Sequence, residues 1–134
     1  MRPVDVPADV VARLRAICDP LPGAYEEAAW AGIRFRVRGR TFVHCVAIAE
    51  GRPPAFSRHA GTRGPALALT FEAEGEELLA LRSSGHPFWK PPWRPTVVGM
   101  FVNDDTDWAE VGELVTESYC VQAPKKLRAQ VRAG

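Results

Sequence analysis

The feature that most constrains how this chain folds is a strict alternation of apolar and basic residues between positions 33 and 38. Ile33, Phe35 and Val37 are separated from one another by arginines. Because successive side chains of a β-strand point to opposite faces of a sheet, this pattern predicts a half-buried strand whose arginines face away from the core. A turn at Arg38-Gly39-Arg40 is expected to lead into a second strand at 41–49, which is apolar nearly throughout.

Other apolar patterns predict the remaining regular elements. Apolar residues at helical spacing predict helices at 5–18, 74–81 and 107–119. Shorter apolar runs predict two more strands, at 66–71 and 96–102. Together with the hairpin, these elements alternate along the chain in an order typical of an antiparallel sheet that is covered by helices.

Individual residues in two of these helices carry more detailed expectations. In the second helix Leu78, Leu79 and Leu81 are expected to face inward. Asp107 is expected to cap the start of the last helix, with Glu110 returning the contact as in a capping box. A short basic tail is expected to follow that helix.

Two stretches are expected to be irregular. Residues 50–65 are rich in Gly, Pro and Arg, and residues 83–95 contain four prolines, which cannot continue regular backbone hydrogen bonding. The predicted fold class is therefore α+β, an antiparallel sheet with helices on one face and the opposite face open. No linker divides the chain, so we expect residues 1–134 to form a single domain.

Cysteine content and hydropathy bear on the cellular compartment. Cys18, Cys45 and Cys120 are odd in number, far apart and surrounded by apolar residues, which is typical of small buried thiols in a reducing environment. The N-terminus lacks the apolar segment of a signal peptide, and no apolar run reaches membrane length. We therefore expect a cytoplasmic protein with no membrane partner.

Charge is unevenly distributed along the chain, although the formal net charge is only +1. Residues 34–63 contain seven arginines and one acidic residue, Glu50. Residues 72–117 contain ten acidic residues and only three basic ones. A chain of this kind can present a basic face while it stays nearly neutral overall.

Several short segments, taken in order, carry a resemblance to a known family. They are Leu21-Pro22-Gly23, Phe35-Arg36-Val37-Arg38-Gly39-Arg40-Thr41-Phe42, His86-Pro87-Phe88-Trp89-Lys90-Pro91-Pro92-Trp93, Asp107-Trp108, Glu117-Ser118-Tyr119 and Ala123-Pro124-Lys125-Lys126-Leu127. By the order and spacing of these segments, the chain resembles the MmcQ/YjbR-like family of small proteins over nearly its whole length.

The resemblance implies both a fold and a function. The implied fold is like that of frataxin (CyaY), a two-layer sandwich of helices against an antiparallel sheet. The implied function is DNA binding through a proposed double-wing arrangement. Iron handling is not implied, because frataxins carry an acidic ridge on the first helix, where this chain has only Asp5 and Asp9 beside Arg13 and Arg15.

The leading functional hypothesis is non-specific DNA binding, in which basic side chains neutralise phosphates. The hairpin arginines supply most of these charges, and the following loop and the basic tail supply the rest. The residues expected to contribute are Arg34, Arg36, Arg38, Arg40, Arg58, Arg63, Lys125 and Lys126. The competing interpretation is that these side chains only solvate one face of a strand.

An alternative hypothesis is a small-ligand or protein-interaction domain that uses residues 86–94 and the open sheet face. His86, Trp89, Trp93 and Arg94 would then line a pocket. The competing interpretation is that these aromatic rings cover the edge of the core beneath a long loop.

No pattern of catalytic or metal-ligating residues supports an enzyme. His44, His59 and His86 lack the spacing of metal ligands, and neither a phosphate-binding glycine motif nor a nucleophile elbow is present. We therefore expect a non-enzymatic binding module without metal or cofactor, as a monomer or weak dimer.

Overall fold

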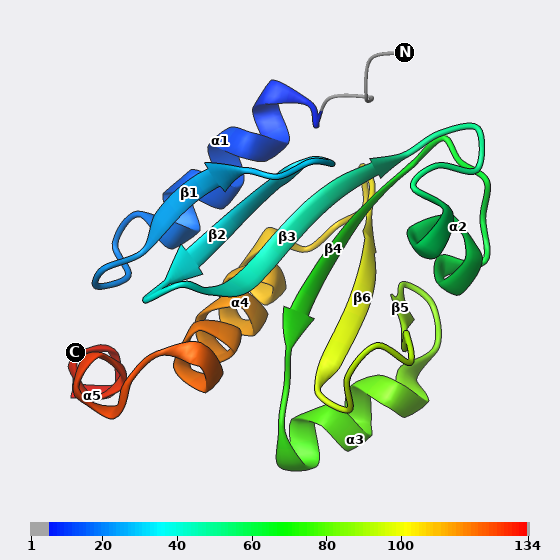
Figure 1. The fold of residues 1–134 in the computed structure, drawn as a ribbon. Coiled ribbons are helices and arrows are strands. Elements are labelled where there is room, and N and C mark those ends of the chain that lie inside the picture. Colours follow the sequence, from blue (N-terminus) through cyan, green and yellow to red (C-terminus); the bar gives the residue numbers. More distant parts are fainter. Residues whose placement is uncertain (1–5, 134) are drawn as a thin grey trace.

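The computed structural model describes residues 6–133 (Figure 1). In chain order its elements are α1 (Ala8–Cys18), β1 (Tyr25–Ala28), β2 (Ile33–Val37), β3 (Arg40–Ile48), α2 (Pro54–Ala60), β4 (Ala66–Glu72), α3 (Gly75–Ser84), β5 (Phe88–Trp89), β6 (Val97–Val102), α4 (Trp108–Gln122) and α5 (Lys125–Ala133). None of these helices combines the length and apolar character needed to cross a membrane.

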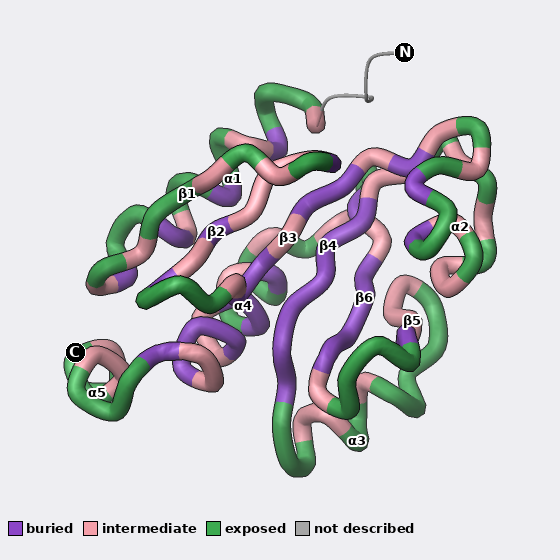
Figure 2. The backbone as a smooth tube through the Cα atoms, in the orientation of Figure 1, coloured by how far each residue is buried: buried purple, intermediate pink, exposed green. Residues whose placement is uncertain are grey.

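The strands form one antiparallel sheet in the order β1-β2-β3-β4-β6-β5. Helices α1 and α4 lie against one face of this sheet (Figure 1). The predicted α+β class, with an antiparallel sheet covered by helices, is confirmed. Figure 2 shows that β3, β4 and β6 are largely buried, whereas β1 at the edge of the sheet is mostly exposed.

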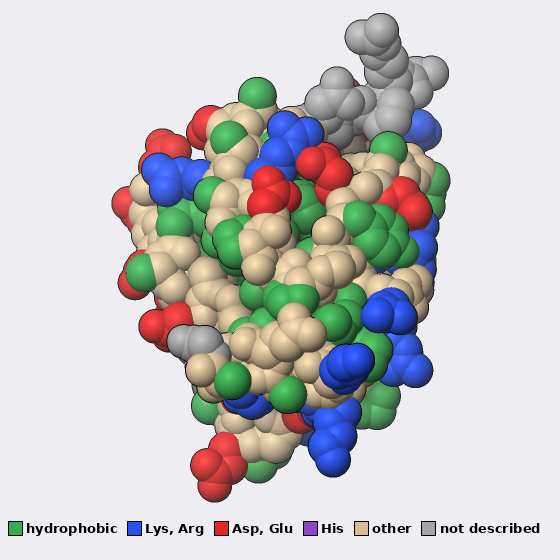
Figure 3. All heavy atoms as spheres, turned by 90° about the vertical axis from the view of Figure 1, so that its left-hand side faces the viewer, with side chains coloured by type: hydrophobic (Ala, Val, Ile, Leu, Met, Phe, Trp, Pro, Cys, Tyr) green, Lys and Arg blue, Asp and Glu red, His purple; other side chains and the backbone are tan. Residues whose placement is uncertain are grey.

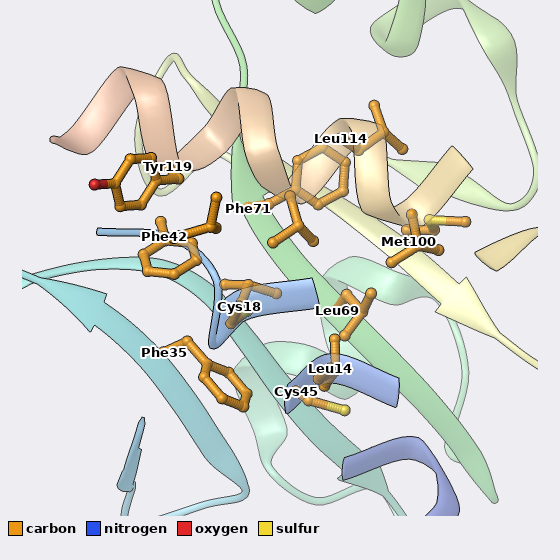
Figure 4. Packing of buried hydrophobic residues seen from close by; sticks show 14 of the residues in the cluster. Leu14, Cys18, Phe35, Phe42, Cys45, Leu69, Phe71, Met100, Leu114 and Tyr119 are labelled. Atoms are coloured by element: carbon orange, nitrogen blue, oxygen red, sulfur yellow. The ribbon is translucent and has the colours of Figure 1, made fainter. Parts of the chain in front are cut away.

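The main hydrophobic core lies between the sheet and the two helices α1 and α4 (Figure 4). Phe35 and Val37 of β2 face this core, as the alternation predicted. Phe42 lies at a break in the register between β2 and β3, and its ring packs edge-on against Tyr119 with centroids 5.4 Å apart. Leu14 of α1 is fully buried opposite them.

Local geometry explains the hairpin and the start of α4. Arg38 and Gly39 both have positive φ, at 50° and 78°, which suits the tight turn between two twisted strands. The carboxylate of Asp107 accepts hydrogen bonds from the backbone N–H groups of Ala109 at 3.0 Å and Glu110 at 3.2 Å. The predicted cap is therefore confirmed, but within residues 6–133 the reciprocal bond expected from the Glu110 side chain does not form.

The opposite face of the sheet is only half open, which corrects the expectation of a fully open face. Residues 50–65 were expected to be irregular, but they contain α2, which begins with Pro54 in its first turn, where the missing N–H costs nothing. Phe56 of α2 packs with Val46 and Ile48 of β3 in a second hydrophobic cluster. This cluster covers the β3–β4 part of the face, and the β1–β2 part stays uncovered.

Other expectations need smaller corrections. Leu79 is 61% exposed, because α3 packs against the core through Leu78 and Leu81 alone. Residues 83–95 include the two-residue strand β5, and the basic tail is the helix α5. The first helix begins at Ala8, with Pro7 outside it as the N-cap, and Asp5 lies outside the described residues.

Strands β3 and β4 diverge at one end of the sheet. Their pairing stops at Val43 and Phe71, although both strands continue beyond this point. The buried hydroxyl of Ser118 on α4 enters the gap, donating to the backbone oxygen of Phe42 at 2.5 Å and accepting from the backbone N–H of Glu72 at 2.8 Å. A side chain of α4 thus replaces the missing hydrogen bonds between the two strands.

Candidate nucleic-acid interface

Arg34 and Arg36 project from the uncovered β1–β2 part of the sheet, as the alternation predicted, but they share one carboxylate. Arg34 donates through Nε to Glu27 Oε1 at 2.8 Å, and Arg36 Nη1 lies 3.4 Å from the same oxygen. The pKa of Glu27 lies below its usual value, mainly because of the hydrogen bond from Arg34. Glu27 therefore offsets one of the two positive charges that these arginines would offer to a phosphate.

Arg38 and Arg40 lie at the turn between β2 and β3, and both are exposed. Neither shares the carboxylate that holds Arg34 and Arg36. The turn that carries them lies at one end of the sheet (Figure 1).

Helix α5 brings Lys125 and Lys126 to the same end of the molecule. The side-chain amide of Gln122, at the end of α4, donates to the backbone oxygen of Thr41 at 3.0 Å, which fixes the start of α5 beside Arg40. A Cβ placed on Gly23 would lie 3.5 Å from Leu127 and 3.9 Å from Val37. The same helix therefore packs next to the strand that leads into the turn.

We call this group of four cations, Arg38, Arg40, Lys125 and Lys126, the basic end. Within residues 6–133 none of the four pairs with a carboxylate. Figure 3 looks at the side of the molecule that carries β1, the β2–β3 turn and α5, and Lys and Arg side chains gather over its lower right. The structure thus brings together half of the predicted basic residues.

Arg58 and Arg63 lie at the other end of the sheet. Arg58 is in α2, and Arg63 lies between α2 and β4, where its Nη2 donates to the backbone oxygen of Glu50 at 3.4 Å. The nine-residue strand β3 separates them from Arg40, a distance of roughly 25 Å at about 3.3 Å per residue. These arginines therefore do not extend the basic end.

The aromatic side chains of residues 86–94 pack mainly onto the protein. The Trp89 ring lies directly over Gly99, where an added Cβ would come within 2.2 Å of it. Trp93 packs against Phe56 with ring centroids 5.0 Å apart, and 37% of it is exposed. His86 stacks on Phe101 at 5.7 Å. The rings cover the β6 side of the sheet, as the competing interpretation of this loop held.

Arg94 lies apart from these rings, in a hollow of about 550 Å³ where β3 and β4 diverge. Arg40 and Thr41 line one side of this β3–β4 hollow, and Arg94 lines the other. Arg94 Nη2 lies 2.5 Å from Glu72 Oε2, and the hydroxyl of Thr96 donates to Glu72 Oε1 at 2.7 Å. No sequence pattern indicated this hollow, because its polar residues are common types that lie on four separate segments.

All three cysteine thiols are buried. Burial raises the pKa of Cys18 and of Cys45 to about 12, and it also raises the pKa of Cys120. These cysteines are therefore protonated at neutral pH and poor nucleophiles. Within residues 6–133 no group of three His, Cys, Asp or Glu side chains is placed to hold a metal ion.

The fold and the basic end define a class, a small α+β protein with a six-stranded antiparallel sheet and a cationic edge. The chain belongs to the YjbR family, whose family model matches residues 20–121. The family assignment drawn from the sequence segments is thus confirmed.

A solved structure supports the fold. The crystal structure of the Deinococcus radiodurans protein DR2400, a DUF419 domain, superposes with a TM-score of 0.61. The two chains are 20% identical, and the alignment covers 91% of this chain and 87% of DR2400. At this identity the likeness shows the fold alone. A search of curated proteins found no match to the chain.

Proposed function

We propose that this protein binds DNA non-specifically, through contacts between phosphates and the basic end. The observation that carries the proposal is the meeting of Arg38 and Arg40 with Lys125 and Lys126, which lie 85 or more positions further along the chain. None of these four cations pairs with a carboxylate among the described residues. They can therefore neutralise phosphates and displace the counterions of DNA, and this release of counterions is the main source of non-specific affinity.

Family membership raises the same expectation independently, since the resemblance to MmcQ/YjbR-like proteins implies DNA binding. The proposal is for a binding protein and not an enzyme, and the high thiol pKa values of Cys18 and Cys45 agree with that. A cytoplasmic location and a monomeric or weakly dimeric state remain our expectations from the sequence.

Fluorescence anisotropy with a labelled DNA duplex across a salt series tests the proposal. Affinity should fall steeply as salt rises, with a log–log slope of about −0.9 for each phosphate contacted. Replacing the four basic-end residues by alanine should weaken binding at low salt by at least about tenfold and make the slope shallower by up to about 3.6.

The matched control removes the same amount of charge from elsewhere. Arg13, Arg52, Arg58 and Arg63 are exposed and lie away from the basic end, so replacing them by alanine gives an equal change in net charge. This control variant should keep most of the affinity. Equal losses of affinity in the two variants would mean that DNA binding depends only on the net charge of the protein, which contradicts a role for the basic end. If the unaltered protein does not bind DNA at low salt, the proposal is overturned.

A further inference from the structure

The β3–β4 hollow adjoins the basic end and has a size suited to a ligand. Its volume of about 550 Å³ lies within the range of small-molecule sites, roughly 300–1,000 Å³. Its floor is the end of α4, and its walls are the diverging ends of β3 and β4 together with the segment that precedes β6. Arg40 belongs both to the hollow and to the basic end.

Cations lie on both sides of the hollow. On one side Arg40 continues into the basic end. On the other side Lys90 lies next to Arg94, and its Nζ donates to the backbone oxygen of Arg94 at 2.8 Å. The pKa of Lys90 is lowered, first by burial and then by the charge of the nearby Arg82. Arg40 and Arg94 thus line the hollow, and Lys90 adds a second cation beside Arg94, whose own charge is shared with Glu72.

The inside of the hollow has a different character from its rims. Glu72 and Glu74 place carboxylates there, and Gln122 adds an amide. Glu72 is 4% exposed and is held by Arg94 and Thr96, whereas Glu74 is exposed and pairs with no cation within residues 6–133. Carboxylates repel a phosphate, but they accept hydrogen bonds from the amino groups on the edge of a nucleobase.

We propose that the hollow receives an unpaired base of a nucleic-acid strand, while the phosphates on either side of that base contact the two cationic rims. The protein then prefers single-stranded to duplex DNA. This inference rests on the proposed function, because it needs the basic end to hold the strand. In a duplex the same base is stacked and paired, and extruding it costs a few kcal/mol.

The experiment compares one labelled oligonucleotide as a single strand, as a blunt duplex and as a duplex with one bulged nucleotide. The unaltered protein should bind the single strand at least about tenfold more tightly than the blunt duplex, with the bulged duplex in between. Substituting Thr41→Phe fills the hollow without removing any charge, and it should bring the affinity for the single strand down to that for the duplex.

Two further variants sharpen the test. Ala28→Phe places the same ring on the exposed edge strand β1, away from the hollow, and should leave the preference unchanged. Glu74→Ala removes the exposed acceptor, so the affinity for oligo-dC relative to oligo-dT should fall, because cytosine has an amino group on its pairing edge and thymine has none. Because Glu74 is exposed, this variant tests the hollow even if Thr41→Phe fails to fold.

The outcomes separate the two proposals. Salt-dependent binding with equal affinity for single strand and duplex would overturn the role of the hollow and leave the proposed function intact. A single-strand preference that survives Thr41→Phe, or an affinity for oligo-dC relative to oligo-dT that is unchanged in Glu74→Ala, would also overturn it. Absence of binding to every form of DNA at low salt would overturn the proposed function itself.

Discussion

Ser118 illustrates at the residue scale how one side chain can hold two strands together. Its side chain is fully buried, and its hydroxyl satisfies a carbonyl of β3 and an N–H of β4 where the two strands no longer pair. Buried backbone groups that lose their partners carry the full cost of desolvation. Ser118 therefore contributes to stability and also fixes the divergence that forms the hollow.

Substituting Ser118→Ala should lower the free energy of unfolding by about 2–4 kcal/mol, since it leaves one N–H and one carbonyl unsatisfied. Urea denaturation followed by circular dichroism measures this change. Ser83→Ala is the control, because the Ser83 hydroxyl is exposed and bonds only within its own helix, to the oxygen of Leu79 at 3.2 Å. A loss below about 0.5 kcal/mol for Ser118→Ala would mean that water replaces the hydroxyl.

His44 should make stability depend on pH. Burial, and to a lesser extent the charge of Arg34, hold its pKa below the usual value, while its Nε2 lies 2.7 Å from the backbone oxygen of Ala31. The unfolded chain therefore binds a proton more readily than the folded protein. His44 stabilises the fold fully above about pH 6.5, and this contribution is lost as the pH falls from there through its lower folded pKa.

The measurement is the free energy of unfolding in urea at about pH 7.5 and about pH 5.5, compared with a His44→Gln variant. The unaltered protein should lose more stability on acidification, at a rate of at most about 1.4 kcal/mol per pH unit. Glutamine keeps a donor for Ala31 but does not titrate. Identical pH profiles for the two proteins would show that His44 is protonated in the folded state as easily as in the unfolded one.

Side-chain directions were predictable residue by residue, whereas partners were not. The two-residue period of a strand was enough to place Arg34 and Arg36 opposite the core. Their shared partner Glu27 lies on β1, whose sequence Tyr-Glu-Glu-Ala does not alternate and was not predicted as a strand. The alternation therefore showed where the arginines point but not that one carboxylate offsets half of their charge.

At the scale of elements, the sequence revealed those that bury a regular apolar face. The hairpin, β4, β6 and α4 were found close to their actual bounds for this reason. Helix α2 was missed because the adjacent prolines Pro53 and Pro54 indicate a loop, although they lie at the N-cap and in the first turn, where proline is tolerated. Helix α5 was missed because its basic residues outnumber the two apolar ones, Leu127 and Val131, that dock it.

Two glycines in neighbouring elements should respond in opposite ways to the same substitution. Gly99→Ala in β6 would push the Trp89 ring away, since the new Cβ would lie 2.2–2.5 Å from it, and should cost about 1–3 kcal/mol. Gly112→Ala in α4 would meet only Ile17, at 3.9 Å, and should stabilise the helix by about 0.5–1 kcal/mol.

Thermal unfolding and tryptophan fluorescence measure both effects. Gly99→Ala should lower the melting temperature and shift the emission to longer wavelength as Trp89 meets water. Gly112→Ala should raise the melting temperature and leave the emission unchanged. If Gly99→Ala left both signals unaltered, Trp89 would not lie over β6 as described.

At the scale of the whole molecule, the folded arrangement overrides the local sums of charge. Residues 72–117 have a strong excess of acidic residues, yet Lys90 and Arg94 from this segment lie along the same edge as the basic end. The arginine-rich segment, in turn, is divided between two ends of the sheet. Charge counted along the sequence predicted a basic face, but only the topology shows which residues form it.

If that arrangement, and not charge alone, supports DNA binding, then loosening α5 should weaken it. Leu127 and Val131 pack α5 against the main core, so substituting both by alanine should loosen the helix while every cation is kept. Lys125 and Lys126 would then no longer be held beside Arg38 and Arg40, and ordering them on binding would cost free energy. The affinity for single-stranded DNA should fall by about three- to tenfold, with only a small change in melting temperature. Replacing exposed Gln130 by alanine is the control. If the double variant bound DNA as tightly as the unaltered protein, α5 would act as a flexible basic arm, and its docking beside the β2–β3 turn would contribute nothing to binding.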